Sequence, residues 1–96
     1  MNKELVRNLL VSKTLKPSPH FKQRQRERKM YLSLDKKVSS KFDILAYEDN
    51  RVAIAYPLNK NNALVIIIDV TDKVLVTLYQ RSHKRLEKGF EIKGGN

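Results

Sequence analysis

The chain contains no cysteine among its 96 residues and only two histidines, His20 and His83. The absence of cysteine excludes disulfides, thiolate nucleophiles and cysteine-ligated zinc. Only these two side chains remain to supply imidazole to a metal. The sequence therefore predicts no metal site and no cofactor.

Glycine and long apolar runs are also scarce. All three glycines lie near the C-terminus, so there is no glycine-rich phosphate loop, which argues against ATP or dinucleotide chemistry. The longest apolar run, residues 63–69, is far too short to span a bilayer, and no signal-type apolar segment follows Met1. We therefore expect one small soluble domain over residues 1–96, located in the cytoplasm.

Acidic side chains are half as numerous as basic ones, with 10 Asp and Glu against 20 Lys and Arg, and the net charge is +10. Residues 1–42 carry +9, residues 43–72 carry −3 and residues 73–96 carry +4. Basic ends favour a polyanionic partner, because neutralised phosphates release counterions. Nucleic acid, RNA rather than DNA, is the predicted partner. The alternatives are an acidic protein, such as an antitoxin, and a merely solvated basic surface.

Two helices are expected before the apolar second half of the chain. Apolar residues at helical spacing between residues 2 and 14 predict an amphipathic helix within residues 1–17, and a Lys-Pro pair ends it. Ser18 then provides an N-cap, and Pro19 suits the first helical position. These signals predict a second, basic helix over residues 18–36.

The basic helix carries the most informative spacing in the chain. His20, Arg24 and Arg28 recur every four residues, so their side chains share one helix face. Histidine titrates near neutrality, and arginine forks bind phosphate oxygens. This face is therefore predicted to handle an anion, and an RNA phosphate is the candidate ligand.

The second half of the chain is typical of an antiparallel sheet over residues 42–81. Short polar turns separate four strand-like runs, which are Phe42–Glu48, Arg51–Tyr56, Ala63–Val70 and Lys73–Gln80. The third run is apolar on both faces, which predicts a central strand covered twice. We therefore expect an α+β fold with N-terminal helices packed on a four-stranded antiparallel sheet, followed by a tail over residues 84–96.

The last strand offers a second set of polar side chains. Strand alternation predicts that Thr77, Tyr79 and Arg81 point to one side together with Leu75, and that Val74, Val76 and Leu78 point to the other. A hydroxyl, a phenol and a guanidinium would then face the basic helix. The plainer interpretation is that Tyr79 is an ordinary strand aromatic and Arg81 a solvated strand end.

A helix beginning His20-Phe21-Lys22-Gln23-Arg24 and continuing Arg26-Glu27-Arg28, with a closing strand Val74-Leu75-Val76-Thr77-Leu78-Tyr79-Gln80-Arg81, resembles small bacterial and phage proteins of the RelE-like and barnase/EndoU/colicin-like nuclease group. Toxins of toxin–antitoxin pairs belong to that group. The resemblance implies a metal-independent endoribonuclease that leaves 2′,3′-cyclic phosphate ends.

The resemblance also implies roles for individual residues. His20 is the candidate acid or base, Arg24 and Arg28 are phosphate clamps, Tyr79 is a proton donor or stacking ring, and Arg81 is a second clamp. Thr77 would position a phosphate oxygen.

A second acid or base is not evident from the sequence. His83 lies in a basic segment typical of a solvated surface, and Glu27 is flanked by arginines that suit a local ion pair. Further candidate nucleic-acid contacts are Lys22, Arg26, Lys29, Lys36, Lys37, Thr77, His83, Lys84 and Arg85.

Three functions remain open at this point. The first is a small ribonuclease. The second is a nucleic-acid-binding protein without catalysis, in which cations hold the backbone and Tyr31 or Tyr79 stacks on a base. The third is a small phage-type regulator that binds an acidic face of a host protein.

Overall fold

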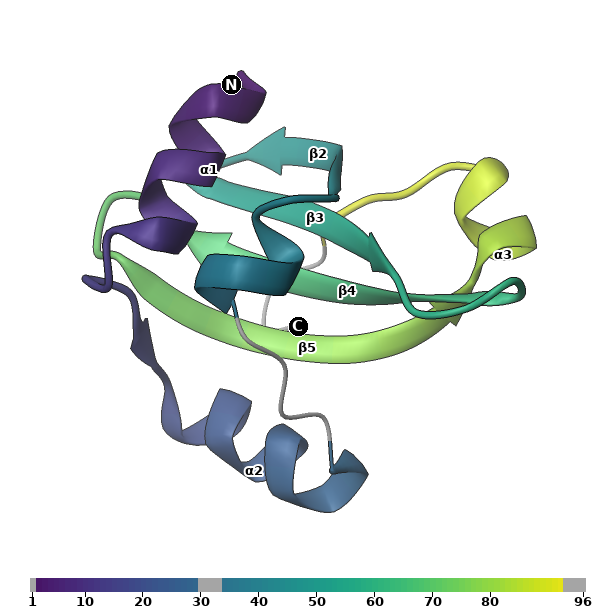
Figure 1. The fold of residues 1–96 in the computed structure, drawn as a ribbon, viewed down its shortest axis with the longest axis horizontal. Coiled ribbons are helices and arrows are strands. Elements are labelled where there is room, and N and C mark those ends of the chain that lie inside the picture. Colours follow the sequence, from purple (N-terminus) through teal and green to yellow (C-terminus); the bar gives the residue numbers. More distant parts are fainter. Residues whose placement is uncertain (1, 30–33, 93–96) are drawn as a thin grey trace.

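A computed structural model describes residues 2–29 and 34–92, which form an α+β structure built on one sheet (Figure 1). Its helices and strands follow one another along the chain as α1 (Lys3–Val11), β1 (Lys16–Pro17), α2 (Pro19–Arg28), the π-helical turn η1 (Leu34–Val38), β2 (Asp43–Glu48), β3 (Arg51–Pro57), β4 (Asn62–Asp69), β5 (Val74–Ser82) and α3 (His83–Glu87). None of the described helices has the length and apolar character needed to cross a membrane.

The sheet has five strands in the order β1-β5-β4-β3-β2 and is mixed. Strands β2 to β5 form the expected antiparallel meander, but β1 pairs with β5 in parallel, so the prediction of a four-stranded antiparallel sheet was wrong in this respect. The Lys16 amide donates to Lys73 O and the Ser18 amide to Leu75 O, each at 2.9 Å. Pro17 lies between these two donors, where an edge strand tolerates a residue without an N–H.

Short turns connect the antiparallel strands as their sequences predict. Asp49 and Asn50 both have positive φ angles, 49° and 66°, which is the conformation of a two-residue hairpin turn. In the next hairpin the Asn59 side chain accepts hydrogen bonds from the amides of Asn61 and Asn62. Local polar side chains therefore fix the hairpins and the register of the strands between them.

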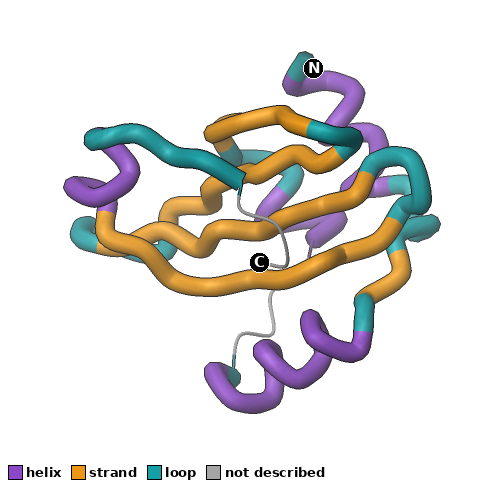
Figure 2. Tube along the Cα trace, turned by 180° about the vertical axis from the view of Figure 1, so that it is seen from behind, coloured by secondary structure: helices purple, strands orange, loops and turns teal. Residues whose placement is uncertain are grey.

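Two apolar layers enclose the sheet. Helix α1 and η1 lie on one face, whereas the chain after α3 crosses the opposite face (Figures 1 and 2). Strand β4 lies in the middle of the sheet and is buried on both sides, as its apolar sequence predicts. Its Leu64, Ile66 and Ile68 belong to the first layer, and Val65 and Ile67 belong to the second.

Strand β5 departs from simple alternation because it contains a β-bulge. Ile67 pairs with Thr77 and Ile68 with Leu75, so Val76 is an extra residue. Leu75 and Leu78 consequently pack in the first apolar layer, and Val76 and Tyr79 in the second. The prediction that Val76 shares a face with Leu78, and Leu75 with Tyr79, was wrong.

A bulge also interrupts β2, in whose sequence the alternation of Phe42, Ile44 and Ala46 predicts one half-buried face. Its register shifts between Ile44 and Ala46. Ile44 contacts the first apolar layer and Ala46 the second, so these two residues do not share one face.

Helix α2 is shorter than the predicted basic helix of residues 18–36. It ends at Arg28, and Lys29 follows in the left-handed conformation with φ of 51°. Lys36 and Lys37 belong instead to η1, a separate turn. Tyr31, a candidate stacking residue, lies outside the described residues.

The tail prediction also changes. The predicted tail of residues 84–96 is helical at its start, because α3 runs from His83 to Glu87. Beyond α3, Phe90 and Ile92 pack against the second apolar layer, together with Leu86.

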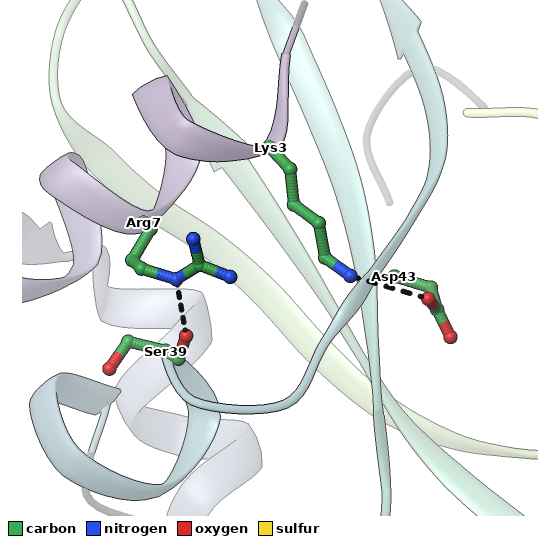
Figure 3. A network of polar contacts seen from close by, with 4 residues as sticks. All are labelled: Lys3, Arg7, Ser39 and Asp43. Atoms are coloured by element: carbon green, nitrogen blue, oxygen red, sulfur yellow. Dashed lines mark hydrogen bonds and ion pairs between the residues drawn. The ribbon is translucent and has the colours of Figure 1, made fainter.

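Polar contacts hold α1 on its end of the sheet (Figure 3). Arg7 Nε donates to Ser39 O at 3.0 Å, and Lys3 Nζ lies 3.7 Å from a carboxylate oxygen of Asp43. Both cations also lie over the buried Phe42 ring, at 5.7 and 5.5 Å from its centroid. Exposed contacts of this kind contribute about 1 kcal/mol or less each, so they orient α1 more than they stabilise it.

Candidate anion-binding site

Helix α2 lies along the edge of β5, and residues at its beginning fix it there (Figure 1). The Ser18 hydroxyl accepts a hydrogen bond from the Phe21 amide at 3.0 Å and donates one to Val76 O at 2.8 Å. One side chain therefore caps the helix and ties it to the strand. Phe21 is 1% exposed and is the buried residue of α2, since it enters the first apolar layer.

This placement aims one face of α2 at β5 and encloses a pocket of about 210 Å³. We call it the His20 pocket, and its lining residues are His20, Arg24, Arg28, Thr77, Tyr79, Gln80 and Arg81. The structure thus brings together the predicted side chains of the helix and those of the strand. They are His20, Arg24 and Arg28 from α2 and Thr77, Tyr79 and Arg81 from β5. Gln80 was not predicted to line the pocket, because strand alternation suggested that its side chain points to the side opposite Tyr79 and Arg81. Thr77, which is 2% exposed, is the most buried of the lining residues.

Tyr79 and Arg81 form a stacked pair in this pocket. The Arg81 guanidinium carbon lies 4.8 Å from the centroid of the Tyr79 ring, within cation–π range. Burial raises the pKa of the Tyr79 phenol above its usual 10.0, and the charge of Arg81 offsets only part of this effect. The phenol therefore keeps its proton at neutral pH and can donate it in a hydrogen bond.

No carboxylate among the described side chains neutralises the charge of the pocket. Among the described residues, Arg24, Arg28 and Arg81 form no ion pair with a carboxylate. Glu27, which we considered as an ion-pair partner, accepts a hydrogen bond from Gln23 Nε2 at 2.9 Å. Three unpaired guanidinium groups around a small pocket favour an anion with several oxygens, such as a phosphate.

The remaining predicted residues lie outside the His20 pocket. Lys22 and Arg26 are exposed on α2, Lys29 is exposed directly after it, and Lys36 and Lys37 are exposed on η1. On α3, Lys84 and Arg85 are exposed and His83 is half-buried. These cations therefore surround the pocket without lining it.

His83 occupies a different environment from His20. Its Nε2 lies 2.9 Å from Asn59 O in the β3–β4 turn, and its side chain lines a separate pocket of about 230 Å³ that also contains Asp43 and Glu87. His83 therefore does not complete an acid–base pair with His20. Within the described ranges, no group of three or more His, Cys, Asp or Glu side chains is arranged to hold a metal.

A larger groove adjoins the His20 pocket, and the sequence did not single out all of its residues. This α3 groove, of about 770 Å³, is lined by Tyr79, Arg81, Arg85, Leu86, Lys88, Gly89, Phe90 and Glu91. Lys88 was missed because it lies in a segment whose sequence is typical of a tail, and in that segment Phe90 suggests only a short edge strand or a partner contact. The signal that was available is the basic-then-aromatic order of residues 84–90.

Comparison with known proteins does not place this chain in a family. No protein-family model matches it, and no curated protein or solved structure matches it either. Function therefore has to be argued from the residues of the site.

Proposed function

We propose that this protein is a metal-independent endoribonuclease that binds an RNA phosphate in the His20 pocket and cleaves the chain there. The observation that carries the proposal is the convergence of His20, Arg24 and Arg28 from α2 with Tyr79 and Arg81 from β5 on one small pocket. A site that only held the RNA backbone would need the cations alone. An imidazole and a phenol beside three guanidinium groups are the additional parts that proton transfer requires.

The reaction is a transfer of the phosphoryl group within the RNA. The 2′-oxygen attacks the adjacent phosphorus and forms a new P–O bond, and the bond from phosphorus to the 5′-oxygen breaks. The His20 imidazole accepts the proton of the 2′-hydroxyl, and the Tyr79 hydroxyl protonates the departing 5′-oxygen. The products are a 2′,3′-cyclic phosphate and a free 5′-hydroxyl. Proton exchange through solvent then returns His20 and Tyr79 to their starting states.

The arginines supply the electrostatic part of the reaction. The transition state carries more negative charge on the phosphate oxygens than the ground state does, and preorganised cations stabilise that increase. Arg24 and Arg28 approach from the helix and Arg81 from the strand. Because Arg81 lies over the Tyr79 ring, its charge also stabilises the phenolate that Tyr79 becomes.

The resemblance to the RelE-like and barnase/EndoU/colicin-like group is consistent with this chemistry. On that basis we extend the proposal to a cytoplasmic toxin or phage protein whose protein partner is an acidic antitoxin. The net charge of +10 supports both an RNA substrate and an acidic inhibitor.

Cleavage of mixed RNA in EDTA, followed by analysis of the 3′ ends, tests the proposal. The wild-type protein should leave 2′,3′-cyclic phosphate, and His20→Ala should lower the rate by about 10²–10⁴-fold, the usual contribution of a general acid or base. His83→Ala is the matched control, because it removes the other histidine and leaves the His20 pocket intact.

A second pair of variants tests the clamp in the same assay. Arg24→Ala should abolish most of the activity, whereas Arg26→Ala removes the same charge from an exposed position on the same helix, outside the pocket, and should lower the activity far less. Intact RNA at micromolar wild-type protein contradicts cleavage, and equal loss in both arginine variants contradicts the assignment of the pocket.

The alternative function is nucleic-acid binding without cleavage. It is favoured by one observation, that His20 is the sole imidazole among the residues that line the pocket. Intact RNA together with tight, strongly salt-dependent binding would select this alternative. Recovery of a specific acidic protein from nuclease-treated lysate, with no RNA binding, would select the regulator instead.

A further inference from the structure

The α3 groove shares two residues with the His20 pocket. Tyr79 and Arg81 line both, so the two depressions meet along the end of β5. The groove is larger, at about 770 Å³ compared with about 210 Å³. Pockets that enclose an organic ligand usually measure roughly 300–1,000 Å³. By size, the His20 pocket suits a phosphate group and the α3 groove suits a nucleotide.

The groove combines cations with apolar rings in the way that nucleotide binding requires. Arg85 and Lys88 come from α3 and its end, and Glu91 is the single carboxylate among the residues that line the groove. Tyr79 and Phe90 are partly exposed, and both pack against the second apolar layer. Packing from below holds the Phe90 ring in place and leaves its outer surface open to a base, whereas Arg81 lies over the Tyr79 ring.

The cations continue beyond the groove. Arg85, Lys88 and Gly89 also line a third depression of about 450 Å³, together with Ser82 and Lys84. The three depressions therefore form one continuous path, in which each shares residues with the next. A path lined by cations and joined end to end matches a flexible polyanion better than a single small anion.

We propose that the α3 groove is a second nucleotide subsite, in which Arg85 and Lys88 hold a phosphate and Phe90 stacks on the base of the nucleotide next to the one in the His20 pocket. This inference deepens the proposed function and rests on it, because it assumes an RNA phosphate in the His20 pocket. The ligand is single-stranded RNA. A duplex would keep its bases stacked on one another, so the Phe90 ring could not reach their faces.

Binding of a 2′-O-methyl RNA octamer, which cannot be cleaved through a 2′-hydroxyl, tests the subsite without interference from catalysis. Fluorescence anisotropy over a range of salt concentrations should show that Arg85→Ala/Lys88→Ala binds on the order of tenfold more weakly. The dependence of log K on log salt should flatten by about 0.7, the value for the one phosphate of a single strand that the variant no longer neutralises. Binding of uridine 3′-phosphate, which fills the His20 pocket alone, should not change.

A charge-matched control is available in the chain. Lys41→Ala/Lys60→Ala removes the same two charges from exposed residues that line none of the three depressions. This variant should retain both the affinity and the salt dependence of the wild type. A loss equal to that of Arg85→Ala/Lys88→Ala would overturn the subsite and leave only a diffuse effect of net charge.

Stacking is tested separately with Phe90→Leu, which keeps an apolar side chain and removes the ring. Octamer binding should weaken about fivefold or more, as expected from loss of one stacked base, while binding of inorganic polyphosphate should stay at the wild-type value. Equal losses for RNA and polyphosphate would contradict stacking.

The same measurements separate failure of the subsite from failure of the proposed function. If the wild type binds the octamer and Arg85→Ala/Lys88→Ala binds it equally well, the subsite is wrong and the proposed function stands. If the wild type binds neither the octamer nor uridine 3′-phosphate, the proposed function falls and the subsite with it. If polyglutamate binds as tightly as RNA and depends on Arg85 and Lys88, the groove accepts an acidic peptide and the RNA subsite is overturned.

Discussion

Helices α2 and α3 begin in closely similar ways at the two ends of the chain. Each has a serine N-cap, Ser18 or Ser82, and each carries a histidine in its first turn, His20 or His83. Yet His20 is exposed on a pocket lined by arginines, whereas the His83 ring is bonded to a backbone carbonyl of the β3–β4 turn. The two histidines therefore lie in different surroundings, although their local sequences are similar. Of the two, His20 is the one that can contact an anion beside arginines.

The difference arises from how each helix is attached to the sheet. Phe21 anchors α2 in the first apolar layer, and the cap of α2 is bonded to β5, so the helix is held along the strand with its charged face toward it. Helix α3 has five residues and none of them is fully buried. Similar residue types thus form a defined pocket beside α2 and part of a more open groove beside α3.

The largest effect should come from removing the anchor of α2. Phe21→Ala deletes a side chain that is 1% exposed, and we expect it to lower the free energy of unfolding by about 3–5 kcal/mol. Leu86→Ala, on the half-buried side of α3, should cost about 1 kcal/mol. Urea unfolding followed by circular dichroism measures both. Equal costs would show that α2 is held no more firmly than α3.

The two serine caps should differ by a smaller amount. Ser18→Ala loses the bond from the Phe21 amide and the bond to Val76 O, and should cost about 1–2 kcal/mol. Ser82→Ala loses a single exposed bond from the Arg85 amide at 3.2 Å, and should cost about 0.5 kcal/mol. The same unfolding experiment measures them. A larger loss for Ser82→Ala would contradict the role of Ser18 in joining α2 to β5.

The features of α2 that the sequence predicted are those determined by neighbours along the chain. The Ser-Pro start and the spacing of His20, Arg24 and Arg28 depend on local helix geometry alone, and both occur in the structure. The antiparallel meander and the central β4 follow from turn residues and apolar runs in the same way. The catalytic roles assigned to these residues stay predictions.

The features that the sequence did not reveal depend on contacts between distant segments. Two residues of β1 carry too little pattern to predict a strand, and their pairing is decided by carbonyl groups on β5. The bulge at Val76 is a property of the β4–β5 pair, not of either strand alone. Phe90 lines a groove only because the chain after α3 crosses the sheet (Figure 2).

The contrast between the two histidines can be measured directly by NMR with inorganic phosphate as the ligand. Addition of phosphate should shift the His20 ring resonances and leave those of His83 nearly unchanged, because only His20 lines the arginine pocket. Arg24→Ala should weaken the shift of His20. Since Asn59 O can only accept, neutral His83 should also show the tautomer with hydrogen on Nε2. Equal shifts of both rings would place the anion elsewhere.

Tyr79 lines both the His20 pocket and the α3 groove, and its titration gives the smallest of the predicted effects. Burial raises the pKa of Tyr79 above its usual 10.0, with Arg81 opposing part of the change. Above about pH 10 the unfolded chain loses the phenolic proton that the native protein retains, so this contribution to stability is complete below about pH 10 and declines as the pH rises.

Tyr79→Phe removes this contribution, so its free energy of unfolding should fall less steeply than that of the wild type at alkaline pH, as measured by urea unfolding at a series of pH values. Tyr47→Phe, which removes a hydroxyl from a side chain that is 46% exposed, serves as the control. Parallel curves for Tyr79→Phe and the wild type would show that the phenol between the two helices is as open to solvent as Tyr47. With its pKa near the usual 10.0, the phenol would then be a stronger acid than its burial indicates, and it would still be protonated at neutral pH.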